Sequence, residues 1–118
     1  MADDLTGRII GAAIEVHRVL GCGLLESVYE EALCHEFRLR GICFKRQISV
    51  DVQYKDISIQ GHLLAEDEVV VELKSVPKLP DVAKAQVLSY LKATGLKRAL
   101  LINFGEVRLA DGIKRISL

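Results

Sequence analysis

The stretch Val69-Val70-Val71-Glu72-Leu73-Lys74 decides how the fold of this chain is organised. Its apolar, β-branched run is typical of a strand that is buried on both faces. Side chains alternate along a strand, so Glu72 and Lys74 are expected to point to the same face. A buried charge without a partner is costly or shifts its pKa. The two residues therefore indicate either a structural ion pair or a cleft that holds solvent or a metal ion.

The segment before this stretch alternates between apolar and polar residues. Residues 43–55 and Ile57–Ala65 predict two further strands, joined by a turn at Lys55-Asp56. The acidic turn Glu66-Asp67-Glu68 then leads into the strand at 69–74. Together these segments predict a three-stranded meander.

Apolar residues at helical spacing predict helices on both sides of the meander. Two helices cover about residues 5–20 and 25–40, and a glycine follows each of them. A third helix begins at Pro80, as its first helical residue, and ends at Thr94 before Gly95. The meander is therefore expected to lie between helices.

The C-terminal part of the chain predicts three more strands. Ala99–Phe104 has the pattern of a buried strand, and Val107–Leu109 and Ile113–Ile116 have that of short edge strands. The resulting order, α-α-β-β-β-α-β-β, contains no internal repeat. It predicts one α/β domain over residues 1–118, with a mixed sheet flanked by helices.

Composition limits the class of protein. The chain has 118 residues, half of them hydrophobic, and a formal net charge of zero. It can bury the core of one domain, and its neutral balance argues against a constitutive polyanion binder. The odd set Cys22, Cys34 and Cys43 lacks a C-x-x-C spacing, as expected in a reducing compartment. Since no signal peptide or membrane span is recognisable, the protein is expected to be cytoplasmic.

Polar residues on the second and third predicted helices have both a structural and a functional interpretation. Glu26 begins a helix, and Tyr29 lies one turn further on the same side. Structurally, the acid would complement the helix dipole and the tyrosine would be a core aromatic with a bonded hydroxyl. Gln86 shares a face with Tyr90 and is expected next to the core, where an unpaired amide is costly. Its amide either bonds neighbouring backbone or reaches towards Glu72 or a phosphate.

Taken together, these residues resemble the GxxExxY family of the PD-(D/E)XK nuclease superfamily. Motifs similar to the family's occur in its order: Gly23 with Glu26 and Tyr29, Glu72-Leu73-Lys74, Gln86 with Tyr90, Ile102-Asn103-Phe104-Gly105, and Gly112-Ile113-Lys114-Arg115. The resemblance runs from about Leu5 to Leu118. It implies a restriction-endonuclease-like fold with an α-β-β-β-α-β core and an extra N-terminal helix.

The resemblance also implies hydrolysis of DNA phosphodiester bonds assisted by Mg²⁺ or Mn²⁺. Glu72 would ligate the metal, helped by the carbonyl of Leu73, and Glu26 would add a direct or water-mediated ligand. Lys74 would position the attacking water and offset charge on the phosphate. The residues implied to support the site or the nucleic-acid backbone are Tyr29, Gln86 and Tyr90.

One substitution separates this chain from the superfamily pattern. The superfamily's leading Asp lies on the preceding strand, where this chain has His62. Gln60 stands where an Arg is frequent, and Ala83 stands where relatives often have His. Neutral His can ligate Mn²⁺ but is a poor ligand for Mg²⁺. The metal set implied for this chain is therefore Glu26, His62 and Glu72, with weakened Mg²⁺ binding and reduced or lost catalysis.

Three functions stay open from the sequence. The chain is a metal-dependent nuclease, a catalytically silent relative that binds nucleic acid or protein, or a structural domain with a buried Glu72–Lys74 pair. Because related nucleases often act as homodimers, self-association is expected, with DNA as the partner and no membrane. Basic residues form either a DNA-binding cluster or a solvated surface: Lys45-Arg46, Lys92, Lys97-Arg98 and Lys114-Arg115.

Overall fold

A computed structural model describes the backbone of residues 4–54 and 57–118, and the side chains of residues 4–46 and 63–118. The turn predicted at Lys55-Asp56 lies outside these residues. The elements in chain order are α1 (Asp4–Leu20), α2 (Glu26–Arg40), β1 (Phe44–Tyr54), β2 (Ile57–Ala65), β3 (Val69–Lys74), α3 (Asp81–Thr94), β4 (Arg98–Asn103), the 3₁₀ helix η1 (Leu109–Gly112) and β5 (Ile113–Ser117).

The strands form a mixed sheet in the order β1-β2-β3-β4-β5. β1, β2 and β3 pair antiparallel, as the predicted meander requires, and β5 pairs antiparallel with β4. β3 and β4 run parallel, and α3 provides the crossover that a parallel pair needs. The predicted α/β class, with an α-β-β-β-α-β core and an extra N-terminal helix, is confirmed.

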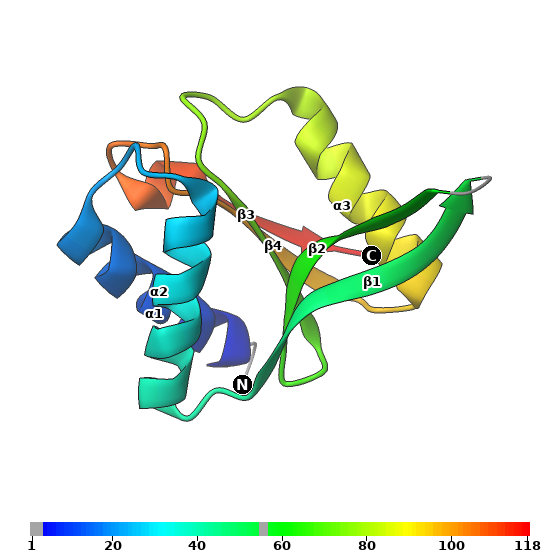
Figure 1. Cartoon of the computed structure of the whole chain (residues 1–118), viewed down its shortest axis with the longest axis horizontal. Coiled ribbons are helices and arrows are strands. Elements are labelled where there is room, and N and C mark those ends of the chain that lie inside the picture. The colour runs from blue at the N-terminus through cyan, green and yellow to red at the C-terminus, as the bar shows by residue number, and fades with distance from the viewer. Residues whose placement is uncertain (1–3, 55–56) are drawn as a thin grey trace.

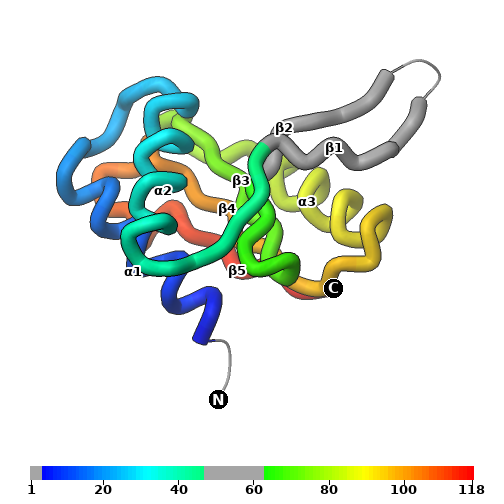
Figure 2. Tube along the Cα trace, turned by 60° about the horizontal axis from the view of Figure 1, so that its bottom comes forward, coloured from blue at the N-terminus to red at the C-terminus, as the bar shows by residue number. Residues whose placement is uncertain are grey.

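Helices cover both faces of the sheet. Figures 1 and 2 show α1 and α2 together on one side and α3 on the other. Alternation along β3 produces this arrangement: Val71 belongs to the cluster beneath α1 and α2, whereas Val70 belongs to the cluster beneath α3. The prediction that this strand is buried on both faces is confirmed.

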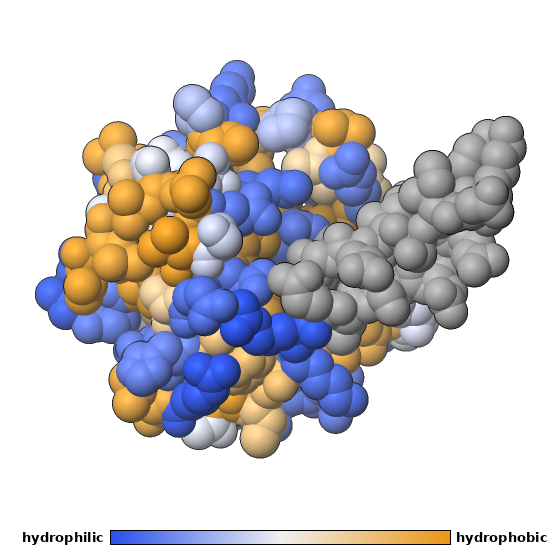
Figure 3. Space-filling model, in the orientation of Figure 1, coloured by the Kyte–Doolittle hydropathy of each residue, from blue (hydrophilic) through white to orange (hydrophobic). Residues whose placement is uncertain are grey.

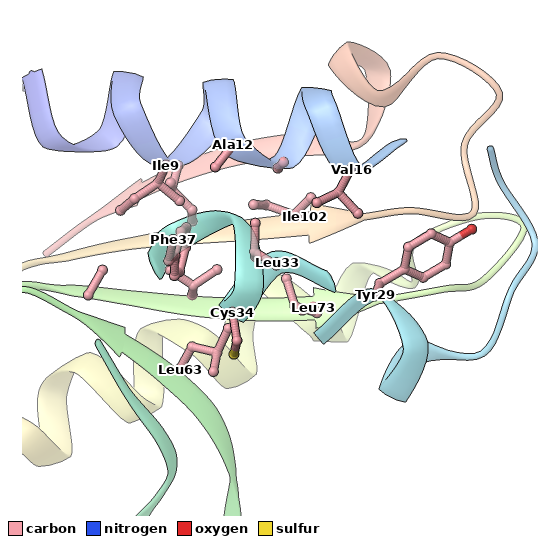
Figure 4. Packing of buried hydrophobic residues seen from close by; sticks show 14 of the residues in the cluster. Ile9, Ala12, Val16, Tyr29, Leu33, Cys34, Phe37, Leu63, Leu73 and Ile102 are labelled. Carbon is pink, nitrogen blue, oxygen red and sulfur yellow. The ribbon is translucent and has the colours of Figure 1, made fainter. Parts of the chain in front are cut away.

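The larger apolar cluster lies between the sheet and the first two helices (Figure 4). Ile9 of α1 and Phe37 of α2 are fully buried, and they pack with Leu73 and Ile102 of the parallel strands. Fully burying a large apolar side chain contributes about 1.5–3 kcal/mol. This cluster therefore holds the parallel strands and α2 in a fixed relation.

The glycines predicted to end helices do so through their backbone conformation. Gly41 follows α2 with a φ of 71°, and Gly95 follows α3 with a φ of 77°. Positive φ is strained for residues with a Cβ, so glycine is the residue suited to this left-handed cap. These two helix ends are confirmed.

Several predicted elements differ from the structure, most by a single residue at one end. Pro80 is not the first residue of α3 but the extended residue before it, with a ψ of 149°. β4 begins at Arg98 and ends before Phe104, which lies in a turn. The strand predicted at Val107–Leu109 is wrong, because this segment bends and leads into η1. It folds back so closely that a Cβ on Gly112 would lie 2.6 Å from the backbone oxygen of Asn103.

Two further findings concern the cysteines and the lengths of the helices. Cys22, Cys34 and Cys43 are all free thiols. Within the described part of the chain, no helix is both long enough and apolar enough to span a membrane.

Candidate active site

The parallel strands end side by side, with Lys74 of β3 opposite Asn103 of β4. In open α/β sheets, ligand sites are found outside the carboxyl ends of such strands. The connection from α1 to α2 reaches the same place, because the Ser75 hydroxyl donates a hydrogen bond to the backbone oxygen of Leu24. The sequence therefore brings the start of α2 to the end of β3.

Glu72 and Lys74 share the face of β3 that Val70 presents to α3. Glu72 is only 9% exposed, and Lys74 is half-buried. A carboxylate with so little solvent contact needs compensation from neighbouring groups. The strand predicted to carry this acid and base is confirmed, and alternation along it puts both on one face.

Glu26, in the first turn of α2, is electrostatically coupled to both residues of β3. Burial of its carboxyl raises the pKa of Glu26 above the usual range for glutamate. The ammonium of Lys74 opposes this rise, and the carboxylates of Glu72 and Glu30 add to it. Two groups predicted for the same site, Glu72 and Lys74, therefore act on Glu26 in the fold.

Tyr90 brings α3 to the same group of charges. Its side chain is almost fully buried, at 6% exposure. Burial raises the pKa of the Tyr90 phenol to about 12, and the nearby carboxylate of Glu72 contributes to the rise. The phenol therefore stays protonated near neutral pH and keeps a proton to donate towards the acidic centre.

The helical pattern predicted that Gln86 lies next to the core, and this prediction is wrong. Gln86 is exposed on α3, whereas Ala83 and Tyr90 of the same helix are buried. The apolar stripe of α3 is narrow, and its other buried members are Val87 and Leu91. Gln86 is one turn from Tyr90, so an exposed amide stands at the solvent side of the group.

Tyr29 has the structural role that its position on α2 also suggested. Its ring is fully buried and stacks on Phe104, with 4.4 Å between ring centroids. Its hydroxyl donates to the backbone oxygen of Gly21 at 2.6 Å and accepts from the backbone nitrogen of Leu24 at 3.1 Å. Figure 4 shows this hydroxyl pointing out of the apolar cluster. Tyr29 therefore shapes the connection that carries Glu26.

Asn103 is a site-shaping residue to which the sequence analysis assigned no role. Its fully buried side chain accepts from the backbone nitrogen of Val76 at 3.0 Å and donates to the backbone oxygen of Val76 at 2.9 Å. It also accepts from the backbone nitrogen of Gly105 at 3.0 Å. The backbone of Gly105 lies so close to that of Val76 that a Cβ on Gly105 would be 2.1 Å from the Val76 oxygen. The available signal was an amide at the end of an otherwise apolar strand.

The histidines lie on three different elements. His62 of β2 pairs through its backbone with Ile48 of β1, and its side chain, like that of Gln60, lies outside the described residues. The Nε2 of His17 lies 2.8 Å from the backbone oxygen of Glu106, which joins α1 to the segment after β4. His35 is exposed on α2.

Part of the basic surface is used in ion pairs. Arg46 contacts Glu30 and Glu31 of α2 at 2.7 Å and 2.6 Å, Lys45 lies 3.0 Å from Asp67, and Arg98 lies 3.8 Å from Glu68. The remaining basic residues of the predicted set are exposed: Lys92, Lys97, Lys114 and Arg115. Whether these basic residues bind DNA or only face solvent stays a prediction.

The surface beside Glu26 is apolar. Leu25 is 74% exposed, and Leu24 and Val28 are also exposed. Figure 3 shows hydrophobic colour over the α1–α2 connection and the start of α2. Apolar side chains thus flank the acidic end of α2.

Within residues 4–46 and 63–118, no three His, Cys, Asp or Glu side chains form a group that could hold a metal ion. Mg²⁺ and Mn²⁺ sites, however, commonly use one or two carboxylates, with water and phosphate as further ligands. Glu26 and Glu72 fit this requirement, because the carboxylate of Glu72 contributes to the raised pKa of Glu26 and a cation would relieve that repulsion.

Comparison with known proteins identifies the family of this chain. A family model described as the PD-(D/E)XK nuclease superfamily matches residues 3–116, nearly the whole chain. No curated protein and no solved structure matches the chain.

Proposed function

Because the chain belongs to the PD-(D/E)XK nuclease superfamily, we propose that it hydrolyses DNA phosphodiester bonds and requires Mn²⁺ rather than Mg²⁺ for full activity. The observation that carries this proposal is the nearly buried Glu72, beside Lys74 and coupled to Glu26 of α2 and Tyr90 of α3. A structural ion pair would require only the two residues of β3. The additional acid and phenol favour a chemical site.

We also infer that the chain falls in the GxxExxY group of that superfamily. Gly23, Glu26 and Tyr29 stand at the motif spacing. The bonds of the Tyr29 hydroxyl to the α1–α2 connection supply a physical reason for that spacing. Glycine suits the connection as well, since Gly23 has a φ of 90°.

In this proposal, Glu72, Glu26 and the Leu73 carbonyl hold the divalent cation. When bound, the cation supplies Lewis-acid polarisation of the phosphate and lowers the pKa of a water. Lys74 orients the attacking water and offsets negative charge that develops on the phosphate. Tyr90, protonated near neutral pH, donates a hydrogen bond at the site, and the exposed Gln86 contacts the nucleic-acid backbone.

The preference for Mn²⁺ comes from His62. The paired part of β2 and β3 runs from Ala65 with Val69 to Leu63 with Val71, and His62 directly precedes Leu63, as Glu72 follows Val71. A neutral imidazole there suits Mn²⁺ better than Mg²⁺, because Mg²⁺ strongly favours oxygen ligands. Replacing the superfamily's Asp by a neutral His also removes one negative charge from the groups around the cation.

The proposal is tested by cleavage of supercoiled plasmid and of labelled single-stranded DNA in Mn²⁺ and in Mg²⁺. Wild type is expected to cleave with Mn²⁺, and Glu72→Gln should lower the rate by at least about 100-fold. Glu68→Gln, on the exposed turn before β3, is the matched control and should keep its activity. His62→Asp should increase activity in Mg²⁺.

Two results would reject nuclease activity. One is absence of cleavage in either metal, and the other is a rate that Glu72→Gln leaves unchanged. Salt-dependent DNA binding without cleavage would instead identify a catalytically silent binder, since phosphate contacts release counterions. Absence of both DNA binding and Mn²⁺ binding would leave the structural domain as the function.

A further inference from the structure

A groove runs along the outer edge of β5, away from the residues assigned above. Its volume is about 460 Å³, and its apolar lining includes Ile10 and Ile14 of α1 and Ile113 of β5. Lys84 of α3 and Lys114 of β5 also line it. None of the residues that line the groove belongs to the candidate active site, so the groove needs a separate explanation.

The edge of β5 is open for pairing. β5 ends the strand order, so among the described strands it has a neighbour on one side only, β4. A free edge presents unpaired backbone N–H and C=O groups that an extended peptide can bond. Ile14 of the adjoining α1 is 48% exposed, so apolar surface lies open next to this edge.

The two sides of the β5 edge differ in chemistry. Lys114 pairs with Leu101, which packs beneath α3, so Lys114 points to the α3 face, where Lys84 lies. Ile113 packs against the cluster beneath α1, and Arg115 is held on that side by a 3.3 Å bond from its Nη1 to the Thr6 hydroxyl. The α1 side of the edge therefore combines apolar side chains with Arg115, which is bonded to Thr6 and also lines the groove, and the α3 side is cationic.

The two lysines, Lys84 and Lys114, are both exposed. Within the described side chains, neither Lys84 nor Lys114 takes part in an ion pair. The whole chain has a net charge of zero, so an uncompensated cationic pair beside an apolar floor is a local feature. Its charge complement is a ligand that carries carboxylates on one side and apolar groups on the other.

We propose that this groove binds an extended segment of a partner protein, in which apolar and acidic residues alternate, as an added strand on β5. Successive side chains of a strand point to opposite faces, so such a segment places apolar groups on Ile10 and Ile14 and carboxylates on Lys84 and Lys114. The proposal does not depend on the nuclease activity.

Two other occupants fit the groove less well. Single-stranded nucleic acid is bound on aromatic platforms, and the residues that line this groove include no aromatic side chain. A second copy that pairs β5 with β5 across a two-fold axis would bring Lys114 and Arg115 of both copies together. Such like charges on facing strands are destabilising.

The test uses a fluorescein-labelled synthetic decapeptide of alternating valine and glutamate, with binding followed by fluorescence anisotropy. A peptide of the same composition, with the valines and glutamates in two blocks, is the sequence control. The alternating peptide should bind wild type at least about tenfold more tightly than the block peptide. Equal binding of the two peptides would overturn the proposal.

Protein variants locate the binding. Lys84→Glu combined with Lys114→Glu should weaken peptide binding about tenfold, because two attractions become repulsions. Lys92→Glu combined with Lys97→Glu makes the same change of charge at exposed positions outside the groove and should have little effect. Ile14→Asp, at a solvent-exposed helix position, should also weaken binding, and circular dichroism establishes that each variant is folded.

The remaining outcomes reject the proposed occupant. If the groove variants lose affinity for a labelled single-stranded oligonucleotide but not for the peptide, the groove is a nucleic-acid surface. If Ile14→Asp abolishes a dimer seen by sedimentation velocity, the groove is an interface between copies. Equal weakening by the groove and control double variants would show only general electrostatic attraction.

Discussion

The two faces of the sheet differ in what covers them. Beneath α1 and α2 lies a continuous apolar cluster that includes Ile9, Phe37 and Phe104. Beneath α3 the apolar cluster is smaller, and the same face carries Glu72 and Lys74. One face of the sheet therefore provides most of the apolar burial, and the other carries the ionisable groups.

This separation has a physical reason. Nearly buried charges are costly, so a domain that keeps them needs stabilisation from other parts of the fold. β3 serves both faces, because its alternate residues Val71 and Leu73 pack beneath the first two helices while Glu72 faces α3. Extensive packing on one face therefore holds in place the strand that positions the acid on the other.

Truncation of one core residue on each face tests this division. Phe37→Ala, beneath α1 and α2, should lower the free energy of unfolding by about 3–5 kcal/mol. Val87→Ala, beneath α3, removes less buried apolar volume and should cost about 1–2 kcal/mol. Urea denaturation measures both changes. Equal losses would contradict the unequal contribution of the two faces.

Substitution of Asn103 tests whether its side-chain hydrogen bonds, rather than apolar packing, hold the backbone next to the candidate site. Asn103→Ala removes three bonds to the backbone of Val76 and Gly105, and should cost about 2–3 kcal/mol. Hydrogen exchange should accelerate at the amides of Val76 and Gly105. Ser75→Ala, which removes one hydroxyl bond to Leu24, is the milder control at about 1 kcal/mol. Unchanged exchange at Val76 would reject this role of Asn103.

Substitution of Glu26 is expected to change the stability least among these variants, and the change depends on pH. The pKa of Glu26 is raised in the folded protein, so the folded protein binds this proton more tightly than the unfolded chain does. The contribution of Glu26 to stability is therefore present at low pH and is lost as pH rises through the folded pKa. Glu26→Gln should raise the Tm at pH 7–8, and its advantage should disappear below about pH 4.

The control for this prediction is Glu31→Gln, on the exposed side of the same helix. Its hydrogen bond with Arg46 lowers the pKa of Glu31, so this carboxylate stabilises the fold at neutral pH. Glu31→Gln should therefore lower the Tm slightly at pH 7, the opposite sign. A Tm difference for Glu26→Gln that does not vary with pH would reject coupling of Glu26 to the site.

Local patterns predicted most of the elements. The apolar run at 69–74, the alternation before it and the glycines at 41 and 95 each depend on backbone geometry within a few residues. The predicted strand at Val107–Leu109 failed because the chain there folds back on Asn103, a contact that a short window of sequence does not contain. Gln86 was misplaced because helical periodicity does not define how wide the buried stripe of α3 is.

The candidate site was only partly predictable for the same reason. The sequence identified Glu72 and Lys74 as a same-face pair, and the motif resemblance added Glu26, Tyr90 and Gln86. The role of Asn103, which bonds backbone groups of residues 76 and 105, could not be assigned without the fold. His62 stays a prediction, because its side chain lies outside the described residues.

By itself, the sequence determined the spacing of apolar residues in the helices and strands, the helix ends at Gly41 and Gly95, and the face that Glu72 shares with Lys74. These follow from dihedral preferences and side-chain alternation, which act over a few residues. Only the tertiary structure decided that the start of α2 meets the end of β3 and that α3 brings Tyr90 to Glu72. Such meetings depend on how whole elements pack against one another, because residues far apart in the chain become neighbours only when their apolar faces are buried together.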